Sequence, residues 1–157
     1  EEEQTHPKGS AILAYLTFPK SRIIIIDKEF QSKNLLEVFD LNKSAVLYPH
    51  KNLSTQEIKP IHSVEINTLI VIDGTWRQAN QIFNQIEILR TLPLYTLPTN
   101  ITNQNPMRKP PSKHHLSTFE SSLYAIEILD QRNYQSSLQA LHKMNDRYKK
   151  FTKTNLT

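Results

Sequence analysis

The fold is decided by residues 67–79, which read Asn67-Thr68-Leu69-Ile70-Val71-Ile72-Asp73-Gly74-Thr75-Trp76-Arg77-Gln78-Ala79. The apolar, β-branched first half of this stretch predicts a strand buried on both faces, as in a parallel sheet that helices cover. Asp73 stands at the carboxyl end of that strand, before a polar turn and a helix. Ligands of open α/β sheets bind at the carboxyl ends of the strands, so Asp73 is a candidate site residue.

Apolar residues take up helical spacing after the turn, and the stripe they form consists of Trp76, Ala79, Ile82, Phe83 and Ile86. This spacing predicts an amphipathic helix packed on the sheet. Thr75 and Gln78 have the spacing of a capping box at its start, and Trp76 begins the stripe, so each of these residues has a plain structural explanation.

The rest of the chain alternates predicted strands with predicted helices. Strands are expected at residues 22–26, 45–48 and 94–97, and helices or helical turns at residues 10–16, 35–39, 54–57, 117–131 and 138–148. The run of four isoleucines within 22–26 favours a central strand, and Pro60 is expected to end the turn at 54–57. This order predicts an α/β domain with a mostly parallel sheet covered by helices.

The length and composition narrow the class of protein. A chain of 157 residues with 38% hydrophobic residues fits one domain, taken here as residues 1–157. No apolar run approaches the roughly 18 residues of a membrane span, and no leader signal is visible. We therefore expect an intracellular protein of the cytoplasm or nucleus, without membrane contact. The absence of cysteine excludes disulfides, thiolate zinc sites and cysteine nucleophiles.

Positive charge collects in the second half of the chain, where ten basic residues outnumber four acidic ones between Ile88 and Thr157. Basic residues interleaved with His114, His115 and Tyr148 suit contacts to nucleic-acid phosphates. The same residues also suit the solvated faces of helices, and charge alone does not separate these two interpretations.

Several familiar chemistries do not fit the residues. The chain has only two glycines, Gly9 and Gly74, so no glycine-rich phosphate loop can be written. A phosphatase of the haloacid dehalogenase type places its nucleophilic aspartate two residues before the second one, where this chain has Val71. His114 and His115 are adjacent rather than spaced along one helical face, so no metal site is expected.

A second capping box, Ser117 to Glu120, follows the proline- and asparagine-rich loop of residues 99–115. A loop of that length is uncommon in a compact domain unless it binds something or is disordered. The two capped helix starts, one after Asp73 and one after the loop, are two places where backbone amides and the helix dipole suit a carboxylate or phosphate.

Residues 72–79, followed some forty residues later by Leu116-Ser117-Thr118-Phe119-Glu120, resemble the two motifs of the DTW-domain family, the tRNA-uridine aminocarboxypropyltransferases. Tyr48-Pro49 is similar to the end of a family strand, and Arg108 matches a family arginine. The resemblance implies a SPOUT-like, knotted α/β fold that binds S-adenosylmethionine without a glycine-rich loop.

The sequence also departs from the family pattern. Asn103 and Asn105 stand where the family usually has serine and tyrosine, and the early His6-Pro7 lacks the glutamate expected after it. The zinc-binding cysteines of many relatives do not precede it. These departures keep open a non-catalytic RNA-binding protein of the same fold, and a methyltransferase that uses the same donor is a third interpretation.

The resemblance implies transfer of the 3-amino-3-carboxypropyl group of S-adenosylmethionine to N3 of a uridine in tRNA. The sequence indicates no protein partner. Asp73 is then either the base for the N3 proton or a ligand for the ammonium of the methionine moiety. The implied catalytic set is Asp73, Thr75 and Trp76. The implied donor-binding set is Tyr48, Pro49, Leu116, Ser117, Thr118 and Glu120, and the implied RNA-binding set is Arg77, Arg108, Lys109 and Lys113.

Overall fold

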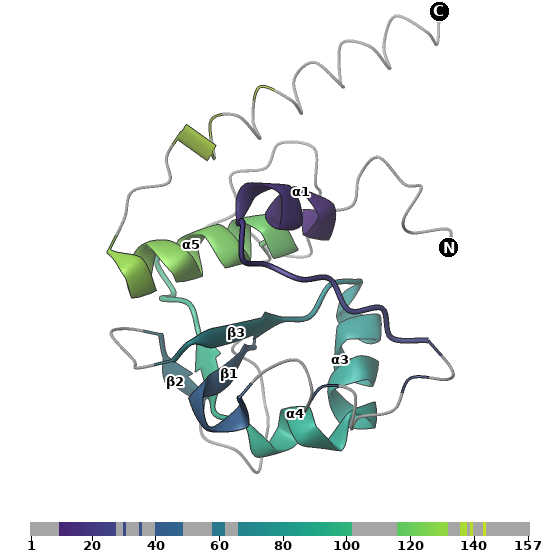
Figure 1. Cartoon of the computed structure of the whole chain (residues 1–157). Coiled ribbons are helices and arrows are strands. Elements are labelled where there is room, and N and C mark those ends of the chain that lie inside the picture. The colour runs from purple at the N-terminus through teal and green to yellow at the C-terminus, as the bar shows by residue number, and fades with distance from the viewer. Residues whose placement is uncertain are drawn as a thin grey trace, which may run out of the picture.

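The computed structural model of the chain describes residues 10–27, 30, 35, 40–48, 58–61, 66–101, 116–131, 136–137, 139 and 143 (Figure 1). Its helices are α1 (Ser10–Thr17), the 3-10 turn η1 (Leu41–Lys43), α3 (Trp76–Gln85), α4 (Glu87–Thr91) and α5 (Thr118–Asp130), and its strands are β1 (Ser44–Leu47), β2 (Ile58–Pro60), β3 (Thr68–Val71) and β4 (Leu94–Thr96). The predicted α/β class is confirmed.

The four strands form one sheet in the order β2-β4-β1-β3, and every neighbouring pair runs parallel. Side chains alternate between the two faces along each strand because the strand repeat is two residues. Val46 pairs with Ile70 and Leu94 in a row on one face. Leu47 pairs with Val71 and Tyr95 in a row on the other.

Helices cover both faces of this sheet. Phe83 and Ile86 at the end of α3 and Leu89 of α4 pack against the face that carries Val46. Ala125, Ile128 and Leu129 of α5 pack against the opposite face.

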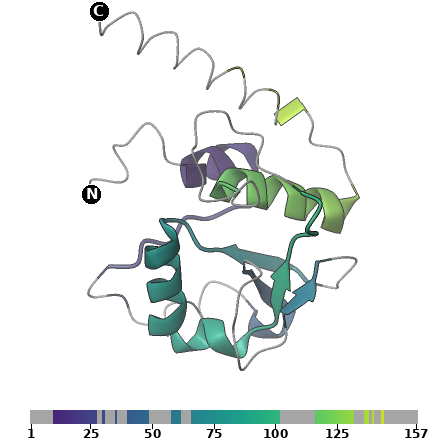
Figure 2. The ribbon, with the colours of Figure 1, turned by 180° about the vertical axis from the view of Figure 1, so that it is seen from behind.

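Helix α1 lies side by side with α5, as Figure 1 and the reverse view in Figure 2 both show. The two helices share an apolar cluster made of Leu13, Ala14, Phe18, Phe119, Leu123 and Tyr124. The domain is therefore layered, with α3 and α4 on one face of the sheet and α5 followed by α1 on the other.

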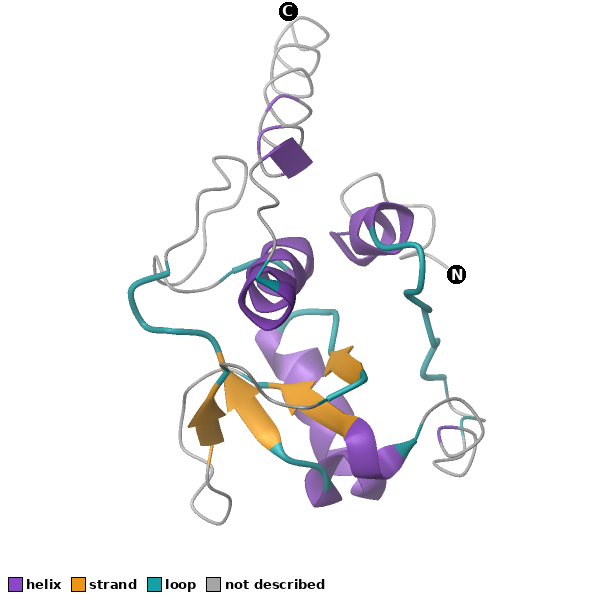
Figure 3. Cartoon of the chain, turned by 60° about the vertical axis from the view of Figure 1, so that its left-hand side comes forward, coloured by secondary structure: helices purple, strands orange, loops and turns teal. Residues whose placement is uncertain are grey.

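The isoleucine run at residues 22–26 is not a strand, which corrects the prediction of a central strand there. Figure 3 shows the segment after α1 as a loop outside the sheet. Ile23, Ile24 and Ile25 are exposed by 47%, 38% and 57%, and Ile26 packs against the cluster that contains Val46. Strand propensity depends on cross-strand neighbours, and β1 and β4 occupy the centre of the sheet instead.

The strand of the opening stretch is present and its residues pack against the clusters on both faces, but the expected full burial is not reached. All four residues of β3 are half-buried, whereas all four residues of β1 are buried. The reason is position, because β3 forms an edge of the sheet and β1 has a strand on each side.

Four other predicted elements are present in the structure, and one strand and one α-helix were not predicted. Strands at 45–48 and 94–97 and helices at 10–16 and 117–131 are confirmed to within about two residues. Strand β2 and helix α4 were not predicted; Pro60, expected to end a helical turn, is the last residue of β2. Because β2 is an edge strand, a proline without an N–H is tolerated there.

Some predictions fall on other parts of the chain. The turn at 54–57 lies outside the described residues, as do most of 35–39, 99–115 and 138–148; Leu35, Gln139 and Lys143 are described and helical. Among the helices that the structure describes, none has the length and apolar character to cross a membrane.

Candidate functional site

The turn that follows β3 brings Asp73 to the edge of the sheet where the parallel strands end. Gly74 makes the turn with a φ of +130°, a backbone conformation that residues with a side chain rarely adopt. A Cβ on Gly74 would also lie 3.1 Å from Gln78 Cβ. The glycine therefore allows α3 to begin three residues after Asp73, at Trp76, and close to it.

The predicted capping box at the start of α3 is confirmed. The Thr75 amide donates to Gln78 Oε1 over 2.7 Å, and the Gln78 amide donates to Thr75 Oγ1 over 3.3 Å. These bonds satisfy two of the amides that a helix start leaves without intrahelical acceptors. Thr75 is exposed, and its hydroxyl is engaged with Gln78 within the cap.

The second capping box, at the start of α5, is also confirmed. Glu120 Oε2 accepts from the Ser117 amide over 2.9 Å and from Ser117 Oγ over 2.6 Å, and the Glu120 amide donates to Ser117 Oγ over 3.2 Å. Glu120 is fully buried at 0% exposure. The helix dipole and these donors stabilise its carboxylate there.

The structure brings the two predicted motifs together. Thr118 Oγ1, on the first residue of α5, donates to Asp73 Oδ1. Ser10 Oγ, on the first residue of α1, donates to the same oxygen over 3.4 Å. Asp73 is half-buried at this junction, so a carboxylate at the end of β3 is held by hydroxyls from two helix starts.

Ser10 was missed as a site residue. The sequence around it indicates only the start of a helix, and its contact with Asp73 spans 63 positions of the chain. No local pattern reports a contact of that range. Its position depends on the packing of α1 against α5.

Tyr48 lies directly after β1, but its side chain is part of the core. The ring centroid lies 4.5 Å from that of Phe83, and the hydroxyl donates to Asn80 Oδ1 over 3.1 Å. Burial raises the pKa of the Tyr48 hydroxyl above its usual value. Both contacts join the end of β1 to α3, which gives Tyr48 a structural role.

The remaining predicted residues are only partly described. Leu116 is half-buried and Ser117 buried, both just before α5, whereas Pro49, Arg108, Lys109 and Lys113 lie outside the described residues. Trp76 begins α3, and its side chain lies outside the described part of the chain.

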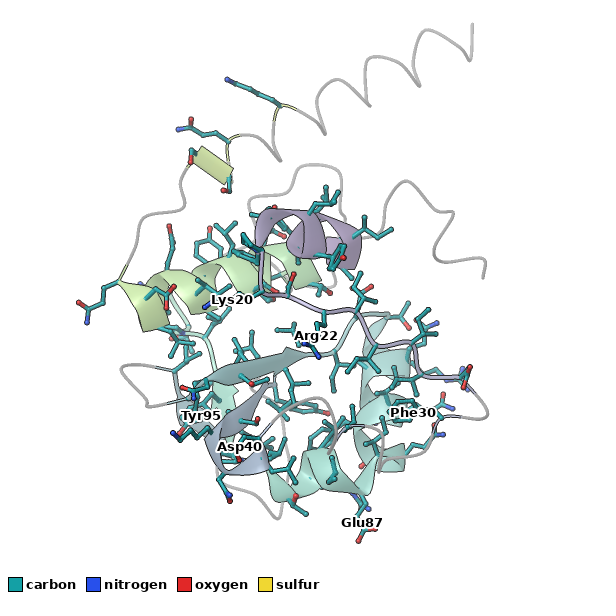
Figure 4. The ribbon with its side chains drawn as sticks, viewed as in Figure 1. Lys20, Arg22, Phe30, Asp40, Glu87 and Tyr95 are labelled. Atoms are coloured by element: carbon teal, nitrogen blue, oxygen red, sulfur yellow. The ribbon has the colours of Figure 1, made fainter. Side chains whose placement is uncertain are left out.

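Exposed basic side chains stand on two segments connected to the site. Arg77 is exposed in the first turn of α3, close in sequence to Asp73. Lys20 and Arg22, which no motif singled out, are exposed on the segment that leaves α1 (Figure 4). Within the described ranges, no group of three or more histidine, aspartate or glutamate side chains could hold a metal ion.

Comparison with known proteins adds independent evidence. The family model described as DTW domain matches residues 1–152. The protein named tRNA-uridine aminocarboxypropyltransferase 2 is 37% identical in Macaca fascicularis over 90 residues, which are 57% of this chain and 30% of that protein. The Mus musculus protein of the same name is 29% identical over 136 residues, 84% of this chain and 46% of that protein.

A Drosophila melanogaster protein of that name is 28% identical over 114 residues, which are 71% of this chain and 45% of that protein. The chain thus spans less than half the length of these curated relatives. No solved structure matches the chain.

Proposed function

This chain belongs to the DTW domain family, and on that premise we propose that it transfers the 3-amino-3-carboxypropyl group of S-adenosylmethionine to N3 of a uridine in tRNA. The observation that carries the proposal is the hydrogen bond from Thr118 to Asp73, because it joins the two family motifs at one place. Three relatives are named tRNA-uridine aminocarboxypropyltransferase 2, which supports a transfer of this group to a tRNA uridine.

The proposed reaction forms a bond between uridine N3 and the terminal carbon of the aminocarboxypropyl group. The bond from that carbon to the sulfonium breaks, and its electron pair stays on sulfur in methylthioadenosine. The N3 proton leaves with a base. Bound S-adenosylmethionine supplies the electrophilic carbon and the neutral leaving group.

The groups at the junction fit such a donor. The carboxylate of Asp73 suits either the ammonium of the methionine moiety or the proton of uridine N3. The amides of Thr118 and Phe119 have no acceptor within α5, as the first amides of a helix do not, and they suit oxygen atoms of the donor. Glu120 orders this turn through Ser117.

The other proposed roles follow the family motifs. Thr75 and Trp76 complete the catalytic set with Asp73, and Leu116, Tyr48 and Pro49 border the donor. For Tyr48 the support is the position of its backbone beside the end of β3, since its hydroxyl is bonded to Asn80.

A tRNA partner requires positive charge near the site. Exposed Arg77 stands next to the junction in sequence, and Arg108, Lys109 and Lys113 precede the second motif. Neutralised phosphates make such binding weaken as salt rises. We propose that the protein acts in the cytoplasm or nucleus, where tRNA is present.

The finer fold is part of the same proposal. A SPOUT-like knot is supported by the all-parallel sheet, by a site at its carboxyl edge, and by a chain with too few glycines for a phosphate loop. A crystal structure of the chain tests it, because a knot requires the chain to pass through a loop.

Mass spectrometry of tRNA nucleosides, after incubation of the chain with S-adenosylmethionine, tests the function. A uridine carrying a 3-amino-3-carboxypropyl group is expected. A methylated nucleoside would indicate a methyltransferase. Binding of tRNA without calorimetric binding of S-adenosylmethionine would indicate a non-catalytic RNA-binding protein.

A further inference from the structure

Asp73 has one oxygen engaged and one available among the described residues. Thr118 and Ser10 both donate to Oδ1, and no described residue donates to Oδ2. Two hydroxyl donors on one oxygen restrict the rotation of the carboxylate. Its second oxygen is then presented in a defined direction, as recognition of a ligand requires.

The charges at this junction favour a cation. Asp73 is bonded to Thr118 at the first position of α5, and the carboxylate of Glu120 is bonded to Ser117, the residue before it. Two carboxylates therefore share the start of one helix, and they offset the positive end of its dipole. The Asp73 carboxylate, which has only Oδ1 bonded among the described residues, therefore suits a cation at this helix start.

Helix α1 reaches the site through packing that does not involve Ser10. Leu13, Ala14 and Phe18 hold α1 against Phe119 and Leu123 of α5. The hydrogen bond of Ser10 is long at 3.4 Å and part-buried, so it holds Asp73 more weakly than the bond from Thr118 does.

We infer that Asp73 recognises the ammonium group of the donor's methionine moiety through Oδ2, and that Ser10 and Thr118 are positioning residues that hold its Oδ1. This inference rests on the proposed function. It assigns Asp73 one of its two possible roles and adds α1 to the donor site.

The test measures calorimetric dissociation constants of the full chain for three compounds. S-adenosylmethionine and S-adenosylhomocysteine carry the ammonium group, and methylthioadenosine lacks it. We expect Asp73→Asn to weaken binding of the first two by about tenfold to a hundredfold, and to leave methylthioadenosine unchanged.

The positioning residues give smaller, matched effects. Ser10→Ala is expected to weaken the binding of S-adenosylhomocysteine by about twofold to fivefold. Thr118→Val is expected to weaken it by about tenfold, and Thr118→Ser should restore the affinity. Ser21→Ala is the control, because Ser21 lies just after α1 and donates to the Phe18 carbonyl, away from Asp73.

A double-mutant comparison separates positioning from a structural effect. In the Asp73→Ala background, Ser10→Ala should have no further effect on affinity, because the group it positions is gone. The inference would be overturned if Asp73→Asn weakened the binding of methylthioadenosine and S-adenosylhomocysteine equally. It would also be overturned if Ser10→Ala lowered the affinity as much in the Asp73→Ala background as in the parent. A parent chain that binds none of the three compounds would instead refute the proposed function, and the inference with it.

Discussion

Thr118 Oγ1 donates to Asp73 Oδ1 across 45 positions of the chain, and this contact joins the start of α5 to the end of β3. Ser10 adds a third element to the same oxygen. The carboxylate is thereby placed where three segments meet, half-buried and at the carboxyl edge of a parallel sheet.

Replacing Asp73 with alanine is expected to lower the transfer rate by about a hundredfold or more, the range associated with loss of a positioned acid–base or charged group. The measurement is labelled donor incorporated into tRNA per unit time. Asp40→Ala serves as the control, since the exposed Asp40 side chain accepts from the Asn42 amide at the start of η1 and has no part in the proposed site. Transfer at the parent rate in Asp73→Ala would remove Asp73 from the mechanism.

Replacing Gly74 with alanine is expected to destabilise the domain by about 1–3 kcal/mol, because the new residue would be held at a φ of +130° with its Cβ 3.1 Å from Gln78 Cβ. Urea unfolding measures the change in the free energy of unfolding. An unchanged midpoint would mean that the turn relaxes at no cost.

Replacing Glu120 with glutamine is expected to cost about 1–3 kcal/mol of unfolding free energy, because a buried carboxylate loses its charge-assisted bonds from Ser117. Glu87→Gln is the matched control, because Glu87 is an exposed first-turn residue of α4 (Figure 4). The control should change stability by less than about 1 kcal/mol. Similar losses in both variants would argue against a special role for the α5 cap.

Alkaline pH is expected to destabilise the fold through buried Tyr48 and half-buried Tyr124. Burial raises the pKa of Tyr48, and burial together with Glu120 and Glu127 raises the pKa of Tyr124. The unfolded chain then releases these protons first, so the stabilising effect is complete below the ordinary pKa of 10.0 and is lost as pH rises beyond it.

The measurement is the free energy of unfolding from pH 8 to about pH 11, compared with Tyr48→Phe/Tyr124→Phe. The double variant should lose less stability over this range than the parent. Its free energy of unfolding at neutral pH should be lower than that of the parent, because Tyr48→Phe removes the hydrogen bond to Asn80. Such a bond contributes about 0.5–1.5 kcal/mol. Parallel pH profiles would contradict the assignment.

Alanine at Ile25 is expected to change stability by no more than about 0.5 kcal/mol, as substitutions on exposed surface usually do. Alanine at Val46 is expected to cost about 2 kcal/mol, because Val46 is fully buried at the centre of the sheet. Urea unfolding of the two variants compares them directly. A large loss at Ile25 would show that the isoleucine run is buried in solution.

The best-predicted features are those whose causes lie within a few residues. Both capping boxes were read correctly because a serine or threonine and a glutamine or glutamate three positions later bond to each other's backbone. The C-terminal part of the predicted apolar stripe is also confirmed, since Phe83 and Ile86 are buried on the sheet and Ile82 packs beside them. The errors concern residues 22–26, β2 and Ser10, where the deciding neighbours are remote in sequence.

The strand, the turn and the capped helix of residues 67–79, the second capped helix at Thr118, and the family resemblance of the two motifs could all be predicted from the sequence alone. These follow from local backbone preferences and from spacing. Only the tertiary structure decided that β1 and not the isoleucine run takes the centre of the sheet, that β3 is an edge, and that Ser10 meets Asp73. Such outcomes depend on which surfaces pack together, and packing is a property of the whole chain.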